Sequence, residues 1–411
     1  MIVWWALILS LVAVCLPCQG EGRDDSAGFE KVQNGIDVLL AEQFAPLQGL
    51  TVGLITNHTG CSLDGTSTID LFHRTRVCRL KALFSPEHGI QGLADEKVHS
   101  GTDAHTGLKV FSLYGDSRKP TPDMLKGLDA LVFDIQDIGT RFYTYIGTLS
   151  LCMQAAREND LQVIVLDRPN PIGGIKIGGA IPSAADCGDL VSIHPIPTCH
   201  GMTVGELAGL FNDQFGIGCR LSVIPMKNWK RAWYFDETGQ KWVNPSPNMK
   251  TLEGAFLYPG IGICETLNLS VARGTDHPFE MYGAPCMDGR KVSEEMSHLG
   301  LPGLEFFPVD FIPTASGHPF RGQVCHGVRI EVTDRSIADP FRAGLHLVQL
   351  FQRLYPGQIQ WRKGFDALAG DRTLWRRLIT EQEDPASILA GWEKPLEQFR
   401  EVRKKYLLYS E

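Results

Sequence analysis

The sequence predicts an α/β protein, with a Rossmann-like, doubly wound N-terminal domain and a smaller α/β C-terminal domain. Three observations support this fold class. Short apolar runs alternate with segments of helical periodicity through the first half of the chain. These runs are continuously apolar, which is typical of parallel strands covered on both faces. The length of 411 residues is enough for more than one domain.

The elements of the first half are expected in an alternating order. Strands are predicted at residues 50–56, 80–85, 128–137, 161–171 and 221–226. Helices are predicted at residues 67–75, 143–160 and 203–215. The last helix has its own start signal, because Thr203 is followed three positions later by Glu206, the pattern of a capping box.

The second half begins with a segment of weak periodicity. Residues 229–290 are rich in glycine, proline, tryptophan and tyrosine, so they are predicted to be a long irregular segment with a functional or linking role. A strand at 327–334, a helix at 340–355 and a helical tail from about 385 are expected after it. We place the domains at 30–254 and 255–411, with the active-site cleft between them.

The first 20 residues have the pattern of a signal peptide. An apolar stretch of about 15 residues is followed by small residues, and it is too short for a comfortable membrane span. No later segment reaches the roughly 18 unbroken apolar residues that a span requires. We therefore predict a secreted or periplasmic protein with no span in the mature chain. A retained N-terminal anchor is the alternative.

Charge and motifs exclude several function classes. The net charge of -8 argues against a nucleic-acid partner, which usually selects for a basic patch. The chain has no P-loop, and its glycine runs lack the GxGxxG spacing, so no cofactor is predicted.

After export some cysteines could pair, and Cys187 and Cys199, which flank one loop, are the best candidates.

Polar loops follow four of the predicted strands. They are TNHTG (56–60), SPEHG (85–89), DIQDIGTRFY (134–143) and DRPNPIGG (167–174). Because ligands bind beyond the carboxyl ends of the strands in such sheets, these loops are expected to form the binding site.

Several longer motifs carry a family resemblance. They are LITNHTG, LFSPEHGIQG, VFSLYG, FDIQDIGTRFYTYIGTL, LDRPNPIGG, HGMTVGELA, PSPNM and ARGTDHPFEMYGAP. Together they resemble the NamZ-like exo-β-N-acetylmuramidase family, formerly a domain of unknown function, across nearly the whole mature chain. The family often has tryptophan after GAP, where this chain has Cys286.

The resemblance implies a fold and an activity. It implies a Rossmann-like domain and a smaller domain with the site in the cleft between them. It also implies an exo-acting glycoside hydrolase that releases terminal N-acetylmuramic acid from the non-reducing end of peptidoglycan fragments. The substrate is then a small carbohydrate or muropeptide, and the catalytic glutamate of the PEHG motif corresponds to Glu87.

Three residues are candidates for catalysis. Glu87 could protonate the leaving oxygen of a glycoside, or it could be an ordinary turn residue. His88 could orient Glu87, bind the sugar or cap the turn. Asp137 could be a second carboxylate, or it could cap the turn after its strand. The nucleophile stays open, since an N-acetylated sugar can use its own acetamide.

Further residues are candidates for substrate binding. A guanidinium suits the lactyl carboxylate of N-acetylmuramic acid, which makes Arg141, Arg168 and Arg273 candidates, although each could instead pair with a neighbouring acid. Tyr143 could stack on a sugar or belong to the core. The remaining candidates are Asn57, Asp134, Asn170, His200, Glu265, Asn268 and Glu280.

Two alternative functions stay open at this stage. One is a catalytically silent carbohydrate-binding protein, which the cysteine at position 286 keeps in consideration. The other is a metal-dependent hydrolase that uses Glu87, His88 and Asp137, although no HxH or HExxH motif occurs.

Overall fold

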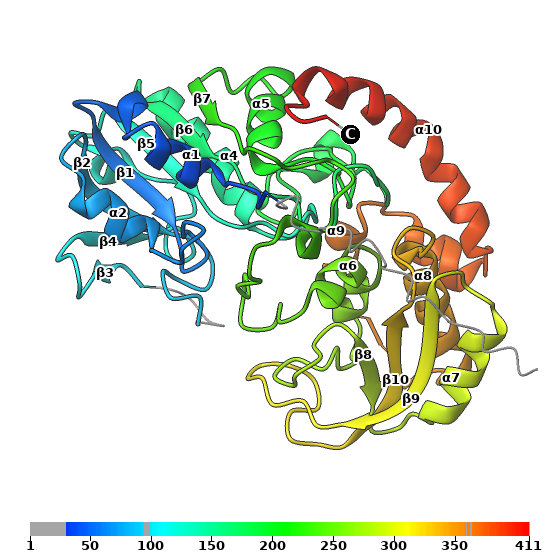
Figure 1. Ribbon diagram of the computed structural model, residues 1–411. Coiled ribbons are helices and arrows are strands. Elements are labelled where there is room, and N and C mark those ends of the chain that lie inside the picture. The colour runs from blue at the N-terminus through cyan, green and yellow to red at the C-terminus, as the bar shows by residue number, and fades with distance from the viewer. Residues whose placement is uncertain (1–29, 94–98, 359, 362–363, 411) are drawn as a thin grey trace, which may run out of the picture. The chain divides into compact units, whose positions relative to one another are not determined.

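A seven-stranded sheet occupies the first half of the chain (Figure 1). Its strands are β1 (Thr51–Thr56), β2 (Arg79–Ser85), β3 (Gly101–Thr102), β4 (Lys109–Ser112), β5 (Ala130–Asp134), β6 (Gln162–Leu166) and β7 (Arg220–Ile224). Their order is β3-β4-β2-β1-β5-β6-β7, and only β3 is antiparallel to its neighbour. On one side of β1 lie β2 and then β4. On the other side of β1 lie β5, β6 and β7, in chain order. The sheet therefore has its switch point between β1 and β5, as in doubly wound folds.

The computed structural model describes residues 30–93, 99–358, 360–361 and 364–410. The predicted signal peptide at 1–20 lies outside these residues. The chain from Lys31 onward belongs to one compact unit. None of the helices in the described ranges has the length and apolar character needed to cross a membrane.

Helices cover both faces of the large sheet, as the fold class requires. On one face are α1 (Gly35–Ala41) and α2 (Thr68–Arg74); on the other are α4 (Tyr145–Glu158) and α5 (Val204–Gln214). Successive side chains of a strand point to opposite faces, so the neighbours Leu54 and Ile55 of β1 belong to different hydrophobic clusters. The short helix α3 (Pro122–Leu125) precedes β5. The predicted doubly wound arrangement is confirmed.

The predicted capping box is present at α5. The Thr203 hydroxyl accepts a hydrogen bond from the backbone N–H of Glu206, and the Glu206 carboxylate accepts one from the backbone N–H of Thr203. Single-turn helices occur at η1 (Ala45–Leu47), η2 (Ala184–Asp186), η3 (Phe235–Thr238), η4 (Gly262–Thr266) and η6 (Lys404–Tyr406).

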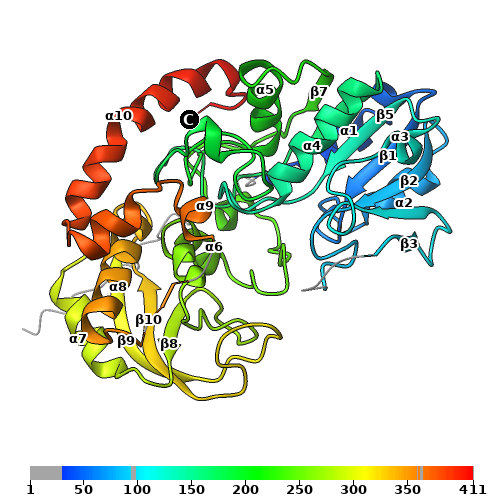
Figure 2. The ribbon, with the colours of Figure 1, turned by 180° about the vertical axis from the view of Figure 1, so that it is seen from behind.

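A smaller antiparallel sheet forms the core of the second half (Figure 2). Its strands are β8 (Met281–Ala284), β9 (Leu304–Phe311) and β10 (Cys325–Val332), in the order β8-β10-β9. Helix α7 (Gly289–His298) packs on β9 and β10, and α8 (Pro340–Leu354) packs on α7. Helix α9 (Phe365–Ala369), a π-helical turn (Arg376–Thr380) and the long helix α10 (Pro385–Arg403) follow.

The prediction of an irregular segment at 229–290 was wrong in part. Helix α6 (Leu252–Ile261) and strand β8 both lie within it. All residues of α6 from Gly254 to Ile261 are buried, so the helix has no polar face and its sequence has no helical period. It packs closely on α8, where a Cβ added to Gly260 would lie 2.1 Å from the carbonyl carbon of Pro340. Glycine at this position therefore allows the two helices to meet.

The chain after α10 returns to the large sheet. The backbone N–H of Leu408 donates to Glu206 Oε1 at 2.8 Å, and the Tyr409 hydroxyl donates to Asp167 Oδ2 at 2.5 Å. Arg403 Nη1 donates to the carbonyl of Gly201 at 2.7 Å. Both carboxylates are buried, so the tail supplies hydrogen bonds that the interior of the first half needs.

Candidate active site

A cavity of about 270 Å³ lies beyond the carboxyl end of β2. Both halves of the chain contribute to it. Its lining residues are Glu87, His88, Tyr114, Phe142, Tyr143, Thr144, Val191, Ser246, Met249, Tyr258, Glu265, Arg273, Phe279, His318 and Leu368. The predicted site residues among them are Glu87, His88, Tyr143, Glu265 and Arg273.

Glu87 stands at the first turn after β2. The strand ends at Ser85, and Pro86 precedes the glutamate, which is half-buried on the cavity wall. The Thr144 hydroxyl, at the start of α4, donates a hydrogen bond to Glu87 Oε2 at 2.6 Å. Burial and the adjacent Glu87 carboxylate raise the pKa of Tyr114, which keeps that phenol protonated. The Thr144 hydroxyl thus fixes the orientation of the Glu87 carboxyl group, and Tyr114 lines the same cavity.

The turn at Glu87 contains a strained residue. His88 has a φ of 69°, in the left-handed region, where few residues other than glycine are found. The following Gly89, with a φ of 76°, continues the turn at no such cost. Strain of this kind gathers at functional sites. Here it places Glu87 and His88 together in the cavity lining.

A second carboxylate of the cavity is held by an arginine. Arg273 Nε donates to Glu265 Oε1 at 2.6 Å, and the Tyr258 hydroxyl donates to Glu265 Oε2 at 3.1 Å. The guanidinium of Arg273 also lies over the ring of Phe279, 4.9 Å from its centre. The cavity therefore contains two carboxylates and one guanidinium.

Asp137 is buried and is not part of the cavity lining. Its Oδ2 accepts a hydrogen bond from the backbone N–H of Gly139 at 2.7 Å and lies 3.9 Å from His200 Nε2. Asp137 Oδ1 and His200 Nε2 have no hydrogen-bond partner within the described part of the chain. Burial raises the pKa of Asp137 to about 7 and lowers that of His200 to about 3.

Tyr143 connects Asp137 with the cavity electrostatically. The pKa of Tyr143 is raised by burial and, to a smaller extent, by the charges of Asp137 and Glu87. Asp137 is buried and acts on Tyr143, which lines the cavity, so Asp137 lies behind the cavity wall rather than in the lining.

The buried Asp137 predicts a specific pH dependence of stability. Its folded pKa of about 7 lies above the ordinary aspartate pKa of 3.8, so the folded state binds the proton more tightly. From about pH 4 to about pH 7 the wild type should lose up to about 4 kcal/mol of unfolding free energy relative to Asp137→Asn. Urea unfolding of both proteins at several pH values measures this difference. The same dependence of the unfolding free energy on pH in both proteins would contradict the prediction.

Asp134 and Arg168 bind each other. Arg168 donates to Asp134 through Nε at 2.6 Å and Nη2 at 3.1 Å, and the Thr68 hydroxyl donates to Asp134 Oδ2 at 2.5 Å. Arg168 Nη2 also donates to the carbonyl of Cys61. Both charged groups are buried, and neither lines the cavity, so we assign them to the scaffold at the ends of β5 and β6.

Arg141 is buried, and its guanidinium donates hydrogen bonds to backbone carbonyl groups rather than to an acidic side chain. It donates to the carbonyls of Val191 at 3.1 Å, Ala367 at 3.0 Å and Leu368 at 2.8 Å. Burial lowers its pKa to about 10. Because Val191 and Leu368 line the cavity, Arg141 fixes its walls instead of reaching the substrate.

The two asparagines predicted at strand ends form local turns. Asn57 Oδ1 accepts from the backbone N–H of Thr59 at 2.9 Å, and Asn170 Oδ1 accepts from that of Ile172 at 3.2 Å. Both side chains are buried outside the cavity lining, as is His200. They shape the loops that carry the site.

The predicted residues Asn268 and Glu280 lie elsewhere in the second half. Asn268 Nδ2 donates to the carbonyl of Gln358 at 2.9 Å, and Glu280 accepts from the hydroxyl of Thr251 at 2.6 Å. Neither lines the cavity. Their polarity is explained by these contacts.

Sequence reasoning missed several lining residues. Tyr114, Thr144 and Ser246 lie in motifs that carry the family resemblance, so those motifs were the available signal. Tyr258 is hidden in the non-periodic helix α6, and His318 lies in a loop without any motif. These two positions could not have been selected from the sequence.

The cysteines and acidic groups give two further results. Cys187 and Cys199 are both free, so the suggested disulfide is not formed, and Cys286 is exposed outside the cavity lining.

In the described ranges, no group of three or more histidine, cysteine, aspartate or glutamate side chains could hold a metal ion.

Comparison with known proteins covers nearly the whole chain. The family model for the N-terminal part of the exo-β-N-acetylmuramidase NamZ matches residues 52–253, and the model for its C-terminal part matches residues 256–409. The peptidoglycan β-N-acetylmuramidase NamZ of Bacillus subtilis (strain 168) is 44% identical over 393 residues, which are 95% of this chain and 94% of that protein.

Two crystal structures of DUF1343 family proteins from Bacteroides fragilis NCTC 9343 are also similar. One has a TM-score of 0.85 and 38% identity, and covers 92% of this chain and 99% of its own. The other has a TM-score of 0.77 and 30% identity, and covers 93% and 100%. The chain therefore belongs to the exo-β-N-acetylmuramidase NamZ family, a family of glycosidases.

Proposed function

We propose that this protein releases terminal N-acetylmuramic acid from the non-reducing end of peptidoglycan fragments. The observation that carries the proposal is the 44% identity, over 95% of the chain, to a peptidoglycan β-N-acetylmuramidase. The cavity at Glu87 supports it, since its volume of about 270 Å³ is small for a ligand pocket and suits a single sugar better than a long glycan.

Glu87 is the proposed general acid. It protonates the glycosidic oxygen as the bond from that oxygen to the anomeric carbon breaks. Water then adds to the anomeric carbon, and its proton returns to the Glu87 carboxylate. The Thr144 hydroxyl keeps the carboxyl group in one orientation through its 2.6 Å hydrogen bond. The group that displaces the leaving oxygen before water adds is either a carboxylate or the acetamide of the sugar itself, and water then displaces that group from the anomeric carbon.

Arg273 is the proposed partner of the lactyl carboxylate. Among the predicted arginines it lines the cavity, whereas Arg141 and Arg168 are engaged elsewhere. A guanidinium can contact two carboxylates at once, so Arg273 can keep Glu265 while it binds the substrate.

This assignment predicts a selectivity that Arg273 controls. Wild type should hydrolyse a chromogenic N-acetylmuramide at least about tenfold faster than the matching N-acetylglucosaminide, since one charge-assisted contact contributes roughly 1.5–3 kcal/mol. Arg273→Gln should lose most of this preference in kcat/KM. Equal rates on both substrates would overturn the assignment, and calorimetric binding of a muropeptide without turnover would favour the binding-protein alternative.

Domain division and export are also proposals. The family models support a boundary near residue 254, with the site formed between domains at 30–254 and 255–411. The apolar N-terminal segment supports export to the periplasm or the exterior through a signal peptide at 1–20. N-terminal sequencing of the protein purified from culture fractions tests both the cleavage and the compartment.

A further inference from the structure

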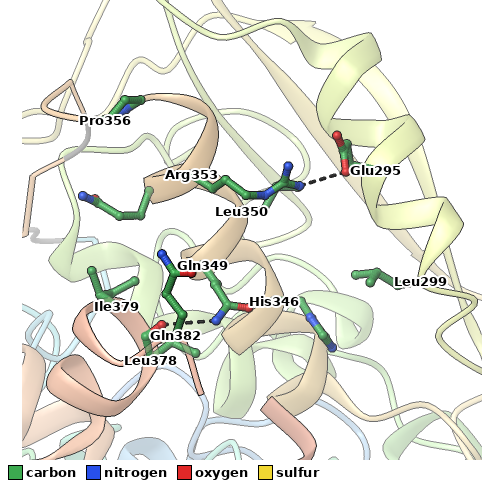
Figure 3. A pocket seen from close by; sticks show the side chains of 11 residues that line it. Glu295, Leu299, His346, Gln349, Leu350, Arg353, Pro356, Leu378, Ile379 and Gln382 are labelled. Atoms are coloured by element: carbon green, nitrogen blue, oxygen red, sulfur yellow. Dashed lines mark hydrogen bonds and ion pairs between the residues drawn. The ribbon is translucent and has the colours of Figure 1, made fainter. Parts of the chain in front are cut away.

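A second cavity, of about 580 Å³, lies between α7, α8 and residues 378–382 (Figure 3). It shares no lining residue with the cavity at Glu87. In its lining, Arg353 Nη2 lies 2.8 Å from Glu295 Oε2, and the two side chains are 59% and 37% exposed. Because these charges balance, the described lining has no net charge that would select a ligand, and we assign it none.

The turn that carries Glu87 packs against His58, a residue of the loop after β1. Residues 86–92 form this turn, which is closed by hydrogen bonds from Gly89 N–H to the Pro86 carbonyl at 3.1 Å and from Gly92 N–H to the Gly89 carbonyl at 3.2 Å. Gly92 is buried, and a Cβ added to it would overlap the ring atoms Cε1 and Nδ1 of His58. The imidazole therefore lies directly against the backbone at the end of the turn.

The same imidazole contacts a second segment of the cavity wall. His58 Nε2 lies 2.7 Å from the carbonyl oxygen of Asn244. A carbonyl oxygen only accepts, so Nε2 carries the proton and donates it. Two residues further along the chain, Ser246 lines the cavity, and between them the carbonyl of Pro245 accepts from the Tyr145 hydroxyl at 2.6 Å. His58 thus joins the turn that carries Glu87 to the segment that carries Ser246.

His58 makes these contacts as a neutral ring. Its Nδ1 is buried and has no hydrogen-bond partner among the described residues. Burial lowers the pKa of His58, and the charge of His88 lowers it further, so the ring is uncharged at pH 7. A proton on Nδ1 would be a buried donor without an acceptor, which is costly. The neutral form with its proton on Nε2 is therefore the one that fits between the two segments.

We propose that His58 is a positioning residue for the catalytic acid, because it holds the Glu87 turn against residues 244–249. The inference rests on the proposed function, in which Glu87 is that acid. His58 is not among the described lining residues, so it acts through the turn and not on the substrate. The turn needs such a support, since the left-handed φ of 69° at His88 persists only where the surrounding structure enforces it.

Steady-state kinetics on a chromogenic N-acetylmuramide tests this role. His58→Ala removes both contacts and should lower kcat about 10–100-fold, as expected when a catalytic group is displaced by about 1 Å, with little change in KM. His58→Gln keeps an N–H donor for the Asn244 carbonyl and should recover part of the loss. In the Glu87→Gln background, His58→Ala should lower kcat little further, because the acid that it positions is absent.

Gly92→Ala tests the packing of the ring on the turn. The added methyl group would overlap the His58 ring, so kcat should fall in the wild-type background and much less in the His58→Ala background. The cost of alanine at a φ of 66° is present in both backgrounds and cancels in the comparison. Gly65→Ala is the matched control. Its φ is 84° and its Cβ would have no atom within 4 Å, so kcat should stay at the wild-type value.

A measurement without substrate separates this inference from the proposed function. Hydrogen exchange of the amides in residues 86–92 should be faster in His58→Ala than in wild type. If wild type does not hydrolyse the N-acetylmuramide, the proposed function fails, while exchange still shows whether His58 holds the turn. Unchanged exchange, wild-type kcat in His58→Ala, or an equal loss in the Glu87→Gln background would each overturn the role. If His58→Ala does not fold, Gly92→Ala should show the same faster exchange and lower kcat.

Discussion

Glu87→Gln is expected to lower kcat on a chromogenic N-acetylmuramide by about 10²–10⁴-fold, the usual contribution of a general acid. The amide cannot donate its proton to the leaving oxygen, yet it has almost the same shape. Its carbonyl oxygen can still accept the hydrogen bond from the Thr144 hydroxyl, now 2.6 Å from Glu87 Oε2. The variant should therefore fold and bind like wild type, so KM and the unfolding midpoint should change little.

Thr144→Val is the matched companion of this variant. It keeps Glu87 but removes the hydroxyl that orients it, so kcat should fall far less than in Glu87→Gln. A substrate with a better leaving group needs less protonation by an acid. The decrease in kcat caused by Glu87→Gln should therefore be smaller on such a substrate. A Glu87→Gln enzyme that turns over at the wild-type rate would remove Glu87 from the mechanism.

Arg168→Met is expected to give the largest loss of stability, about 3–5 kcal/mol. It leaves the carboxylate of Asp134, which has no exposed surface, buried without its cation. The double variant with Asp134→Asn should recover part of the loss, because the unpaired charge is then gone. Urea unfolding at pH 7 measures all three proteins.

A matched control for Arg168→Met is found on the same sheet. Arg220 of β7 pairs with Asp160 at 3.6 Å, but both side chains are exposed. Arg220→Met should therefore cost less than about 1 kcal/mol. A stable Arg168→Met protein that binds substrate poorly would instead support the sequence-based assignment of Arg168 to the substrate.

The central strands of the first half could be predicted because they are buried on both faces, whereas the largely exposed strands β3 and β4 at the edge of the sheet were not predicted. The buried strands are continuously apolar, and the helices between them keep one polar face, so each type has its own pattern. Helix α6 has no polar face and contains Pro259 and Gly260, so its sequence resembles a loop. Burial on all sides removes the periodicity by which a helix is recognised.

Without the family resemblance, which singled out Glu87, the candidate site could be predicted only as an edge of the sheet. Glu87 and Asp134 are both acids at the carboxyl ends of strands, and no local pattern separates them. The difference lies in Arg168, which is 34 positions from Asp134 in the sequence and adjacent in the structure. Long-range pairing of this kind decides which acid is neutralised inside the scaffold and which lines the cavity.

The contacts of the C-terminal tail set an order on folding during synthesis. Asp167 and Glu206 emerge from the ribosome long before Leu408 and Tyr409, which later donate to their carboxylates. Until the tail arrives, the region around β6 and α5 has two acidic groups without these donors. The large sheet can thus assemble first, but the hydrogen bonds of its interior are completed only when residues 408–409 have packed against it.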